Sequence, residues 1–214
     1  MMEYYPVYLN LSGKPCVVIG GNPEAECKVA GLLRAKAEVT VIGPEVTPGL
    51  AKLAQDGTIC WRERPFRCGD LTGAYLVIST IADEAINRQV WDEGEANNAM
   101  VNVMDVVPYC NFIAPSILRQ GDLTVAISTN GKAPALAVRL RQFLEKKLGH
   151  EYGRFLAMAG AIRSPLADKY PDLQTRRQLW YQLVDSDVLD LLKHGQDDQA
   201  RRRFAEIMGV EPTI

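Results

Sequence analysis

Histidine, paired cysteines and long apolar runs are scarce in this sequence of 214 residues. The two histidines, His150 and His194, leave little room for a multi-histidine metal site. The five cysteines form an odd set without a C-x-x-C pair, so we expect neither a disulfide framework nor a cysteine zinc site, and we assign no metal ligands. No run reaches the roughly 18 apolar residues of a membrane span, and the start lacks the features of a signal peptide. We therefore expect a cytoplasmic protein with no membrane partner.

A surplus of one charge is also missing. The chain holds 24 basic and 26 acidic residues, a formal net charge of −2. A nucleic-acid-binding protein normally carries a clear basic excess. We therefore expect no nucleic acid as a partner.

The first half alternates short apolar runs with segments of helical period. The apolar runs are 16–19, 39–42, 58–61, 75–79 and 100–103, and the helical segments are 24–36, 48–54 and 83–97. Continuous apolar strands separated by helices are typical of a parallel sheet covered on both faces. We predict a doubly wound α/β domain over residues 1–112.

The pattern changes after this domain. Residues 112–118 and 123–128 flank Gln120-Gly121-Asp122, which predicts a β-hairpin or a pair of strands that extends the sheet. From Pro134 onward the apolar spacing is helical. A helical tail of about 65 residues is small for a core of its own, so we expect it to pack on a neighbour.

A glycine turn joins the first predicted strand to the first predicted helix. Its residues are Gly20, Gly21, Asn22, Pro23, Glu24 and Ala25. Such a turn directs backbone N–H groups and the positive end of a helix dipole at a bound pyrophosphate. In the pattern G-x-G-x-x-G/A, Gly20 and Ala25 match, but Asn22 replaces the middle glycine and its Cβ crowds the approach of a phosphate. The turn alone leaves a dinucleotide site and a tight structural turn both open.

An acidic residue about 20 residues further along is expected to bind an adenosine ribose. Glu45 has this separation and follows Pro44, although a solvated loop acid is about equally favoured. No basic residue lies between Ala37 and Ala51, so none is at hand there for a 2′-phosphate. We therefore prefer NAD to NADP as the cofactor.

Several segments, in this order, resemble the precorrin-2 dehydrogenase family. They are Tyr5-Pro6-Val7-Tyr8-Leu9-Asn10-Leu11, Gly20-Gly21, Asp70-Leu71, Asn102-Val103-Met104-Asp105, Phe112-Ile113-Ala114-Pro115 and Ile127-Ser128-Thr129-Asn130-Gly131-Lys132-Ala133-Pro134-Ala135-Leu136-Ala137. The family includes stand-alone enzymes and the amino-terminal part of sirohaem synthases. The likeness covers about residues 3–145 and is weaker in the helical tail.

The resemblance implies NAD-dependent oxidation of the tetrapyrrole precorrin-2 to sirohydrochlorin, in some members followed by insertion of Fe²⁺. It also implies a homodimer with three parts: a Rossmann domain over 1–112, a dimerisation segment over 113–150 and a helical domain over 151–214. The active site would lie in the cleft between these parts.

The resemblance also assigns roles to residues. Asp105 matches the catalytic aspartate, although a capping or turn aspartate is the plain alternative. Thr129 matches a hydroxyl beside the substrate, and a structural turn role is equally favoured for it. The neighbours of Thr129 that we include as substrate contacts are Ser128, Asn130 and Lys132. The positions that match NAD contacts are Gly20, Gly21, Asn22, Pro23, Glu24, Pro44 and Glu45.

The distribution of charge along the chain agrees with an anionic substrate better than the net charge of the whole chain does. Residues 1–112 hold 9 basic and 14 acidic side chains, residues 113–150 hold 6 and 2, and residues 151–214 hold 9 and 10. The middle segment, with net charge +4, is a candidate counter-surface for the carboxylates of a tetrapyrrole, although solvated helix faces explain part of it. Its basic residues are Arg119, Lys132, Arg139, Arg141, Lys146 and Lys147.

Two other functions remain open at this point. One is a non-catalytic, NAD-responsive regulatory module that uses the same dinucleotide-binding half. The other is a dehydrogenase of another small metabolite.

Overall fold

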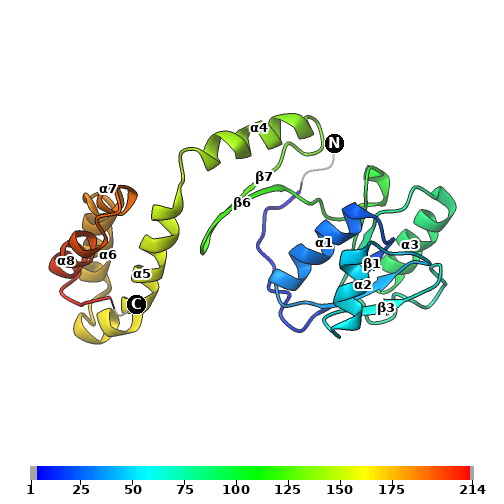
Figure 1. The fold of residues 1–214 in the computed structure, drawn as a ribbon, viewed down its shortest axis with the longest axis horizontal. Coiled ribbons are helices and arrows are strands. Elements are labelled where there is room, and N and C mark those ends of the chain that lie inside the picture. Colours follow the sequence, from blue (N-terminus) through cyan, green and yellow to red (C-terminus); the bar gives the residue numbers. More distant parts are fainter. Residues whose placement is uncertain (1–3, 213–214) are drawn as a thin grey trace. The chain divides into compact units, whose positions relative to one another are not determined.

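A computed structural model describes residues 4–212 and divides the chain into two compact units, Met1–Ala114 and Pro115–Ile214 (Figure 1). The boundary lies two residues beyond the one expected after residue 112. The second unit contains both expected segments, 113–150 and 151–214, and their separation at residue 150 stays a prediction.

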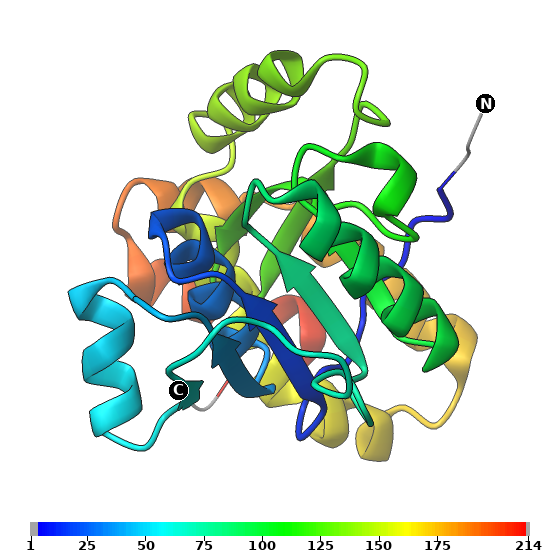
Figure 2. The ribbon, with the colours of Figure 1, turned by 90° about the vertical axis from the view of Figure 1, so that its right-hand side faces the viewer.

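The described part of the first unit contains a parallel sheet and three α-helices. In chain order the elements are β1 (Pro15–Ile19), α1 (Pro23–Arg34), β2 (Glu38–Ile42), α2 (Pro48–Gln55), β3 (Cys60–Arg62), β4 (Leu76–Ser79), α3 (Glu84–Ala96), β5 (Met100–Val103) and the 3₁₀-helix η1 (Val107–Tyr109). The strand order is β3-β2-β1-β4-β5, with every pair parallel (Figure 2). The predicted doubly wound α/β fold is confirmed.

Alternate side chains of the strands bury themselves on the two faces of the sheet. Cys16 and Val18 of β1 lie in a core with α1 and α2, whereas Val17 and Ile19 lie in a core with α3. Because both faces are covered, the strands need apolar residues at successive positions. This is why they appear in the sequence as continuous apolar runs.

The sheet reverses its winding direction between β1 and β4. The chain runs from β1 outward through β2 to β3, and then returns to place β4 on the other side of β1. At such a switch point the connections leave the sheet in opposite directions and open a crevice at the carboxyl ends of the strands. Ligands of doubly wound sheets bind there, so the topology indicates where to look for a site.

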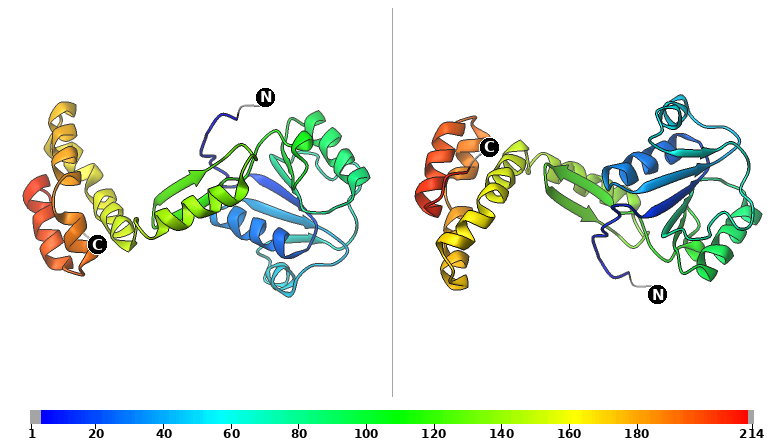
Figure 3. Two further views of the ribbon diagram at one scale, coloured as in Figure 1. Left: turned by 90° about the horizontal axis from the view of Figure 1, so that it is seen from above. Right: turned by 90° about the horizontal axis from the view of Figure 1, so that it is seen from below.

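The second unit begins with a hairpin that forms a sheet of its own. Strands β6 (Ser116–Gln120) and β7 (Leu123–Ile127) pair antiparallel, so the hairpin alternative is observed and the extended sheet is not. Helix α4 (Pro134–Glu145) lies along this hairpin (Figure 3). The remaining helices are α5 (His150–Lys169), α6 (Leu173–Val184), α7 (Val188–Lys193) and α8 (Asp197–Met208).

The helical tail buries an apolar core that is entirely its own. The members that are almost completely buried include Ile162, Leu183, Val188 and Phe204. The tail is thus large enough for a core of its own, because all four helices contribute apolar residues to a single centre. Its packing on a neighbour stays a prediction. Among the described residues, no helix is long and apolar enough to cross a membrane.

Asp70 locks the loop that connects β3 to β4. Its carboxylate, 6% exposed, accepts hydrogen bonds of 2.6 and 2.7 Å from Arg64, one of 2.9 Å from Arg62 and one of 2.8 Å from the backbone N–H of Arg67. The hydrogen bonds from Arg64 are the main reason why the pKa of Asp70 falls from 3.8 to about 2. The Asp70-Leu71 pair of the sequence thus has a structural role.

This lock predicts a pH-dependent stability. Since the pKa of Asp70 is lower in the folded chain, the carboxylate stabilises the fold above about pH 4, and this contribution disappears between about pH 4 and pH 2. Asp70→Asn is expected to cost about 1 kcal/mol near neutral pH, because partly exposed arginines are screened by water. Urea unfolding between about pH 7 and pH 2.5 should show the variant and the wild type converging in acid. A difference that stays constant over this range, or an equal effect of the exposed control Asp56→Asn, would contradict the prediction.

Candidate functional site

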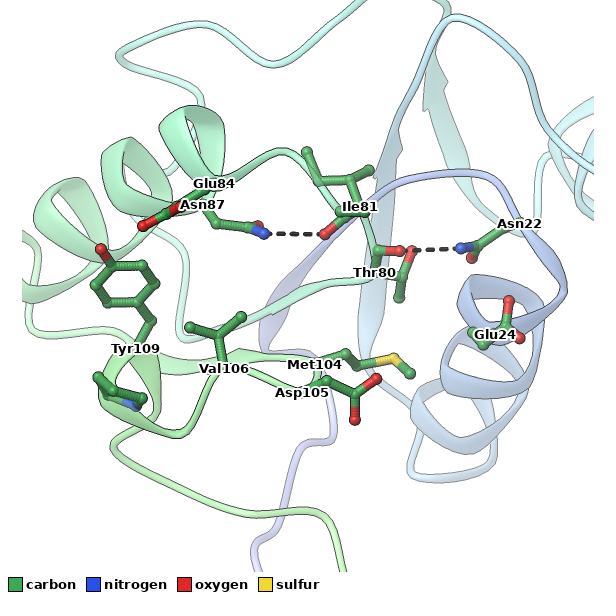
Figure 4. A pocket seen from close by; sticks show the side chains of 12 residues that line it. Asn22, Glu24, Thr80, Ile81, Glu84, Asn87, Met104, Asp105, Val106 and Tyr109 are labelled. Carbon is green, nitrogen blue, oxygen red and sulfur yellow. Dashed lines mark hydrogen bonds between the residues drawn. The ribbon is translucent and has the colours of Figure 1, made fainter.

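A pocket of about 810 Å³ lies at the switch point of the first unit. Residues from the carboxyl ends of β4 and β5 and from the first turns of α1 and α3 surround it (Figure 4). Its lining comprises Asn22, Glu24, Thr80, Ile81, Ala82, Glu84, Asn87, Met104, Asp105, Val106, Pro108 and Tyr109. Of the site residues expected from the sequence, Asn22, Glu24 and Asp105 therefore share one pocket.

The glycine turn approaches its neighbours too closely for any other residue. Gly20 has φ +111°, and a Cβ there would lie 2.3 Å from Thr80 Oγ1. A Cβ at Gly21 would lie only 1.9 Å from the carbonyl oxygen of Glu45. The two glycines thus bring β1, the connection after β2 and the segment after β4 together at one point.

Asn22 caps the N-terminus of helix α1. Its Oδ1 accepts a 2.9 Å hydrogen bond from the N–H of Ala25, which is the capping arrangement for a helix N-terminus. Pro23 follows in the first turn, where a missing N–H costs nothing. Ala25 is completely buried, as expected for the small residue that lets this helix pack against the sheet.

The segment after β4 forms the wall of the pocket opposite α1. Thr80 Oγ1 donates to the carbonyl of Ile19, and Ile81 O accepts a 2.9 Å hydrogen bond from Asn87 Nδ2. Asn87, which is 1% exposed, also accepts a 2.6 Å hydrogen bond from Ser79. Sequence reasoning missed Asn87, although a polar residue on the same helix face as the buried Val90 is a usable signal.

Asp105 lies at the tip of a tight turn directly after β5. Val106 N–H bonds to Val103 O, which closes a four-residue turn, and Asp105 has φ +62°. A positive φ at this position favours glycine or asparagine, so an aspartate there carries a backbone cost. Within residues 4–212, the exposed carboxylate of Asp105 has no hydrogen-bond or ion-pair partner.

The thiol of Cys110 contacts two backbone carbonyls of this turn. Its Sγ lies 3.2 Å from Val103 O and 3.3 Å from Val106 O, so the thiol contacts both ends of the turn. Burial raises the pKa of the Cys110 thiol, which keeps the sulfur protonated and able to donate. The cysteine has a structural role there.

The pocket is acidic. Glu24, Glu84 and Asp105 all line it, and none of its twelve lining residues is basic. Positive potential at this edge comes instead from the N-termini of α1 and α3, which begin at Pro23 and Glu84. An anion bound here would therefore have to lie against helix N-termini and backbone N–H groups.

Pro44 and Glu45 are exposed and are not among the residues that line this pocket. Their connection is nevertheless attached to the glycine turn, because Thr47 N–H donates to Gly21 O at 2.9 Å. The sheet also brings Arg62 opposite Ile42 at this edge, but its guanidinium is bonded to Asp70.

The predicted substrate residues Ser128, Thr129, Asn130 and Lys132 lie in the second unit, in the connection between β7 and α4. Thr129 Oγ1 accepts a 3.2 Å hydrogen bond from the N–H of Ala133, and Ser128 Oγ accepts one of 3.0 Å from that of Asn130. These hydroxyls thus hold the turn that precedes α4. Their contact with a substrate stays a prediction.

The pocket and the turn beside it fit a dinucleotide, although Gly20, Gly21 and Pro23 of that turn are not among the residues that line the pocket. Two glycines without room for a Cβ, a capped helix N-terminus and the crevice at the strand switch are the elements that hold a pyrophosphate in doubly wound folds. The pocket volume is also in the range of cofactor sites, which is about 300–1,000 Å³.

Comparisons with known proteins agree with this assignment. A family profile described as "Putative NAD(P)-binding" matches residues 7–116. The profiles of the sirohaem biosynthesis protein central region and the sirohaem synthase dimerisation region match residues 120–147 and 151–208.

Similar curated proteins are sirohaem synthases. That of Methylobacillus flagellatus is 37% identical over 207 residues, which cover 97% of this chain and 44% of the relative. That of Neisseria meningitidis serogroup C is 34% identical over 205 residues, which cover 96% and 43%. The chain thus spans less than half the length of these relatives.

A solved structure named "SirC, precorrin-2 dehydrogenase" has the same fold, with a TM-score of 0.80 and 22% identity over 96% of this chain and 99% of that one. From these matches, the chain belongs to the family described as putative NAD(P)-binding, whose profile covers residues 7–116.

Proposed function

We propose that the chain is an NAD-dependent precorrin-2 dehydrogenase that forms sirohydrochlorin. The observation that carries the proposal is the carboxylate of Asp105, which has no partner within residues 4–212 and lines the same pocket as Asn22 and Glu24 of the glycine turn. The names of the sirohaem synthase relatives and of the structural neighbour support the choice of substrate. A regulatory module needs no proton acceptor in this pocket, whereas a dehydrogenase does.

The reaction removes a hydride and a proton from the tetrapyrrole. NAD⁺, when bound, supplies the hydride acceptor. The carboxylate of Asp105 accepts the proton. It is available for this role because it has no hydrogen-bond or ion-pair partner among the described residues. The tight turn after β5 holds this carboxylate at the pocket, and the Cys110 thiol stabilises the turn through its contacts with Val103 O and Val106 O.

NAD rather than NADP is favoured by the charges at the edge of the sheet. The pocket lining has no basic residue, and Arg62, opposite the end of β2, is engaged by Asp70. A 2′-phosphate needs a cation, whereas a ribose hydroxyl needs an acceptor such as Glu45.

The substrate and the assembly extend the proposal to the second unit. The basic segment 113–150 would bind carboxylates of the tetrapyrrole, with Ser128, Thr129, Asn130 and Lys132 as contacts. We also propose a cytoplasmic homodimer. The profile described as a dimerisation region matches residues 151–208, whereas the resemblance implies 113–150 as the dimer-forming segment, so both segments are candidates for the dimer contact.

The decisive experiment is anaerobic incubation of the full chain with precorrin-2 and NAD⁺. Sirohydrochlorin absorbance and NADH should rise together in equal amounts. No change with a competent substrate would overturn the proposal, and reduction of NAD⁺ only with another metabolite would favour a different dehydrogenase.

Fe²⁺ insertion is a second activity to measure, because the same unpaired carboxylate could take protons from pyrrole nitrogens. Sirohydrochlorin would be mixed with Fe²⁺ or Co²⁺ with and without the protein. Equal rates of metal insertion would exclude this activity.

A further inference from the structure

We propose that Asn22 is a positioning residue for the dinucleotide, and that its side chain clamps the first turn of α1 to the wall of the pocket formed by residues 80–82. The inference rests on the proposed cofactor and goes beyond it. It explains why asparagine stands where the glycine pattern has its middle glycine.

Both ends of the Asn22 amide are used. Oδ1 accepts from the N–H of Ala25 at 2.9 Å, and Nδ2 donates to the carbonyl of Thr80 at 2.9 Å. The second bond joins residues 58 positions apart in the chain, across the switch point between β1 and β4 (Figure 4). One side chain therefore caps the helix and fixes the facing segment.

The facing segment is held from its other side as well. Ile81 O accepts from Asn87 Nδ2, and Asn87 is itself fixed by the hydroxyl of Ser79. Two successive carbonyls, those of Thr80 and Ile81, are thus bound by amides from α1 and α3. This leaves the segment little freedom, although it belongs to no helix or strand.

The backbone at Asn22 does not require glycine. Its φ of −75° and ψ of 174° are extended values that any residue adopts. A glycine would therefore remove two hydrogen bonds without relieving strain, and it would add freedom to the turn. The crowding of a phosphate by the Cβ of Asn22 stays a prediction, and the two hydrogen bonds add a role for the side chain in preorganising the turn.

The clamp acts on the cofactor through geometry. Asn22 and Glu24 of the glycine turn line the same pocket as residues 80–82. Because the clamp already fixes the separation of these two segments, binding of a dinucleotide costs less conformational entropy. Asn22→Gly, which restores the consensus pattern, should then weaken NAD⁺ binding by about 10-fold, the scale of one lost hydrogen bond and a loosened segment.

The test combines NAD⁺ titration calorimetry with hydrogen exchange of the ligand-free full chain. Asn22→Gly should bind NAD⁺ more weakly and show faster exchange in residues 80–83. Asn22→Ser keeps an oxygen for the N–H of Ala25 but has no donor that reaches Thr80, so it should reproduce both effects. The matched control Asp172→Gly removes the helix cap of α6 in the second unit and should leave both readouts unchanged.

The outcomes separate this inference from the proposed function. Equal or tighter NAD⁺ binding by Asn22→Gly would overturn the positioning role, and unchanged exchange in residues 80–83 would overturn the clamp itself. Absence of NAD⁺ binding in the wild-type chain would overturn the proposed cofactor, and with it the role of the clamp toward that cofactor. Exchange in the ligand-free variants would still report whether the clamp exists.

Discussion

Asp105→Asn is expected to lower the turnover of precorrin-2 by about 10²–10⁴-fold, the range that general-base catalysis contributes. Asparagine has nearly the same shape but cannot accept the proton. It also tolerates the positive φ of Asp105. NAD⁺ affinity and the unfolding midpoint should therefore remain near their wild-type values.

Single-turnover absorbance measures the chemical step, and titration calorimetry measures NAD⁺ binding. Asp56→Asn is the matched control, because it removes one exposed carboxylate of the same unit outside the pocket. Turnover within about threefold of wild type would mean that Asp105 is only a turn residue and that the proton leaves by another route. A parallel loss of turnover and stability would point to the turn itself.

The parallel sheet could be predicted because its physics is local. Strands buried on both faces need apolar residues at successive positions. The runs Val17-Val18-Ile19 and Leu76-Val77-Ile78 satisfy this requirement and can be recognised directly in the sequence. The resemblance singles out Asp105, and its position directly after an inner strand agrees with that choice, since ligands of such sheets bind at this edge.

The contacts across the switch point could not be predicted. The bond from Asn22 to Thr80 depends on β4 returning to the side of β1, and the lock of Arg62 and Arg64 on Asp70 depends on how a loop folds. The spacing of these residues in the sequence gives no information about either contact. In the sequence alone Asn22 is only a departure from the glycine pattern, whereas in the structure its side chain makes two hydrogen bonds that glycine cannot make.

The hydroxyls before α4 also make contacts that could not be predicted from the sequence. Helix α4 has no side-chain cap at Ala133, but Thr129, four residues earlier, accepts a hydrogen bond from the N–H of Ala133. This structural role is sufficient to explain the threonine at this position.

Whether Thr129 also contacts a substrate is decided by comparing the substrate KM of Thr129→Ser, which keeps the hydroxyl, with that of Thr129→Val, which removes it.

Gly21→Ala is expected to damage both the fold and the cofactor site, whereas Gly31→Ala in the same region should improve stability. The new Cβ at Gly21 would lie 1.9 Å from the backbone oxygen of Glu45, so the glycine turn and the connection after β2 must move apart. We expect a loss of about 1–3 kcal/mol in the free energy of unfolding, as for other overpacked sites. NAD⁺ affinity should fall by about 10-fold or more, because the displaced turn also begins α1.

Gly31 lies inside α1 with nothing within 4 Å of a Cβ, so alanine there should add about 0.5–1 kcal/mol and leave NAD⁺ binding unchanged. Urea unfolding and NAD⁺ titration of the two variants separate the effect of crowding from that of adding a methyl group to this helix region. If Gly21→Ala binds NAD⁺ as the wild type does, the glycine turn is only a tight structural connection. The dinucleotide would then have to bind away from this turn, since a Cβ at Gly20 or Gly21 meets the segment after β4 or the connection after β2.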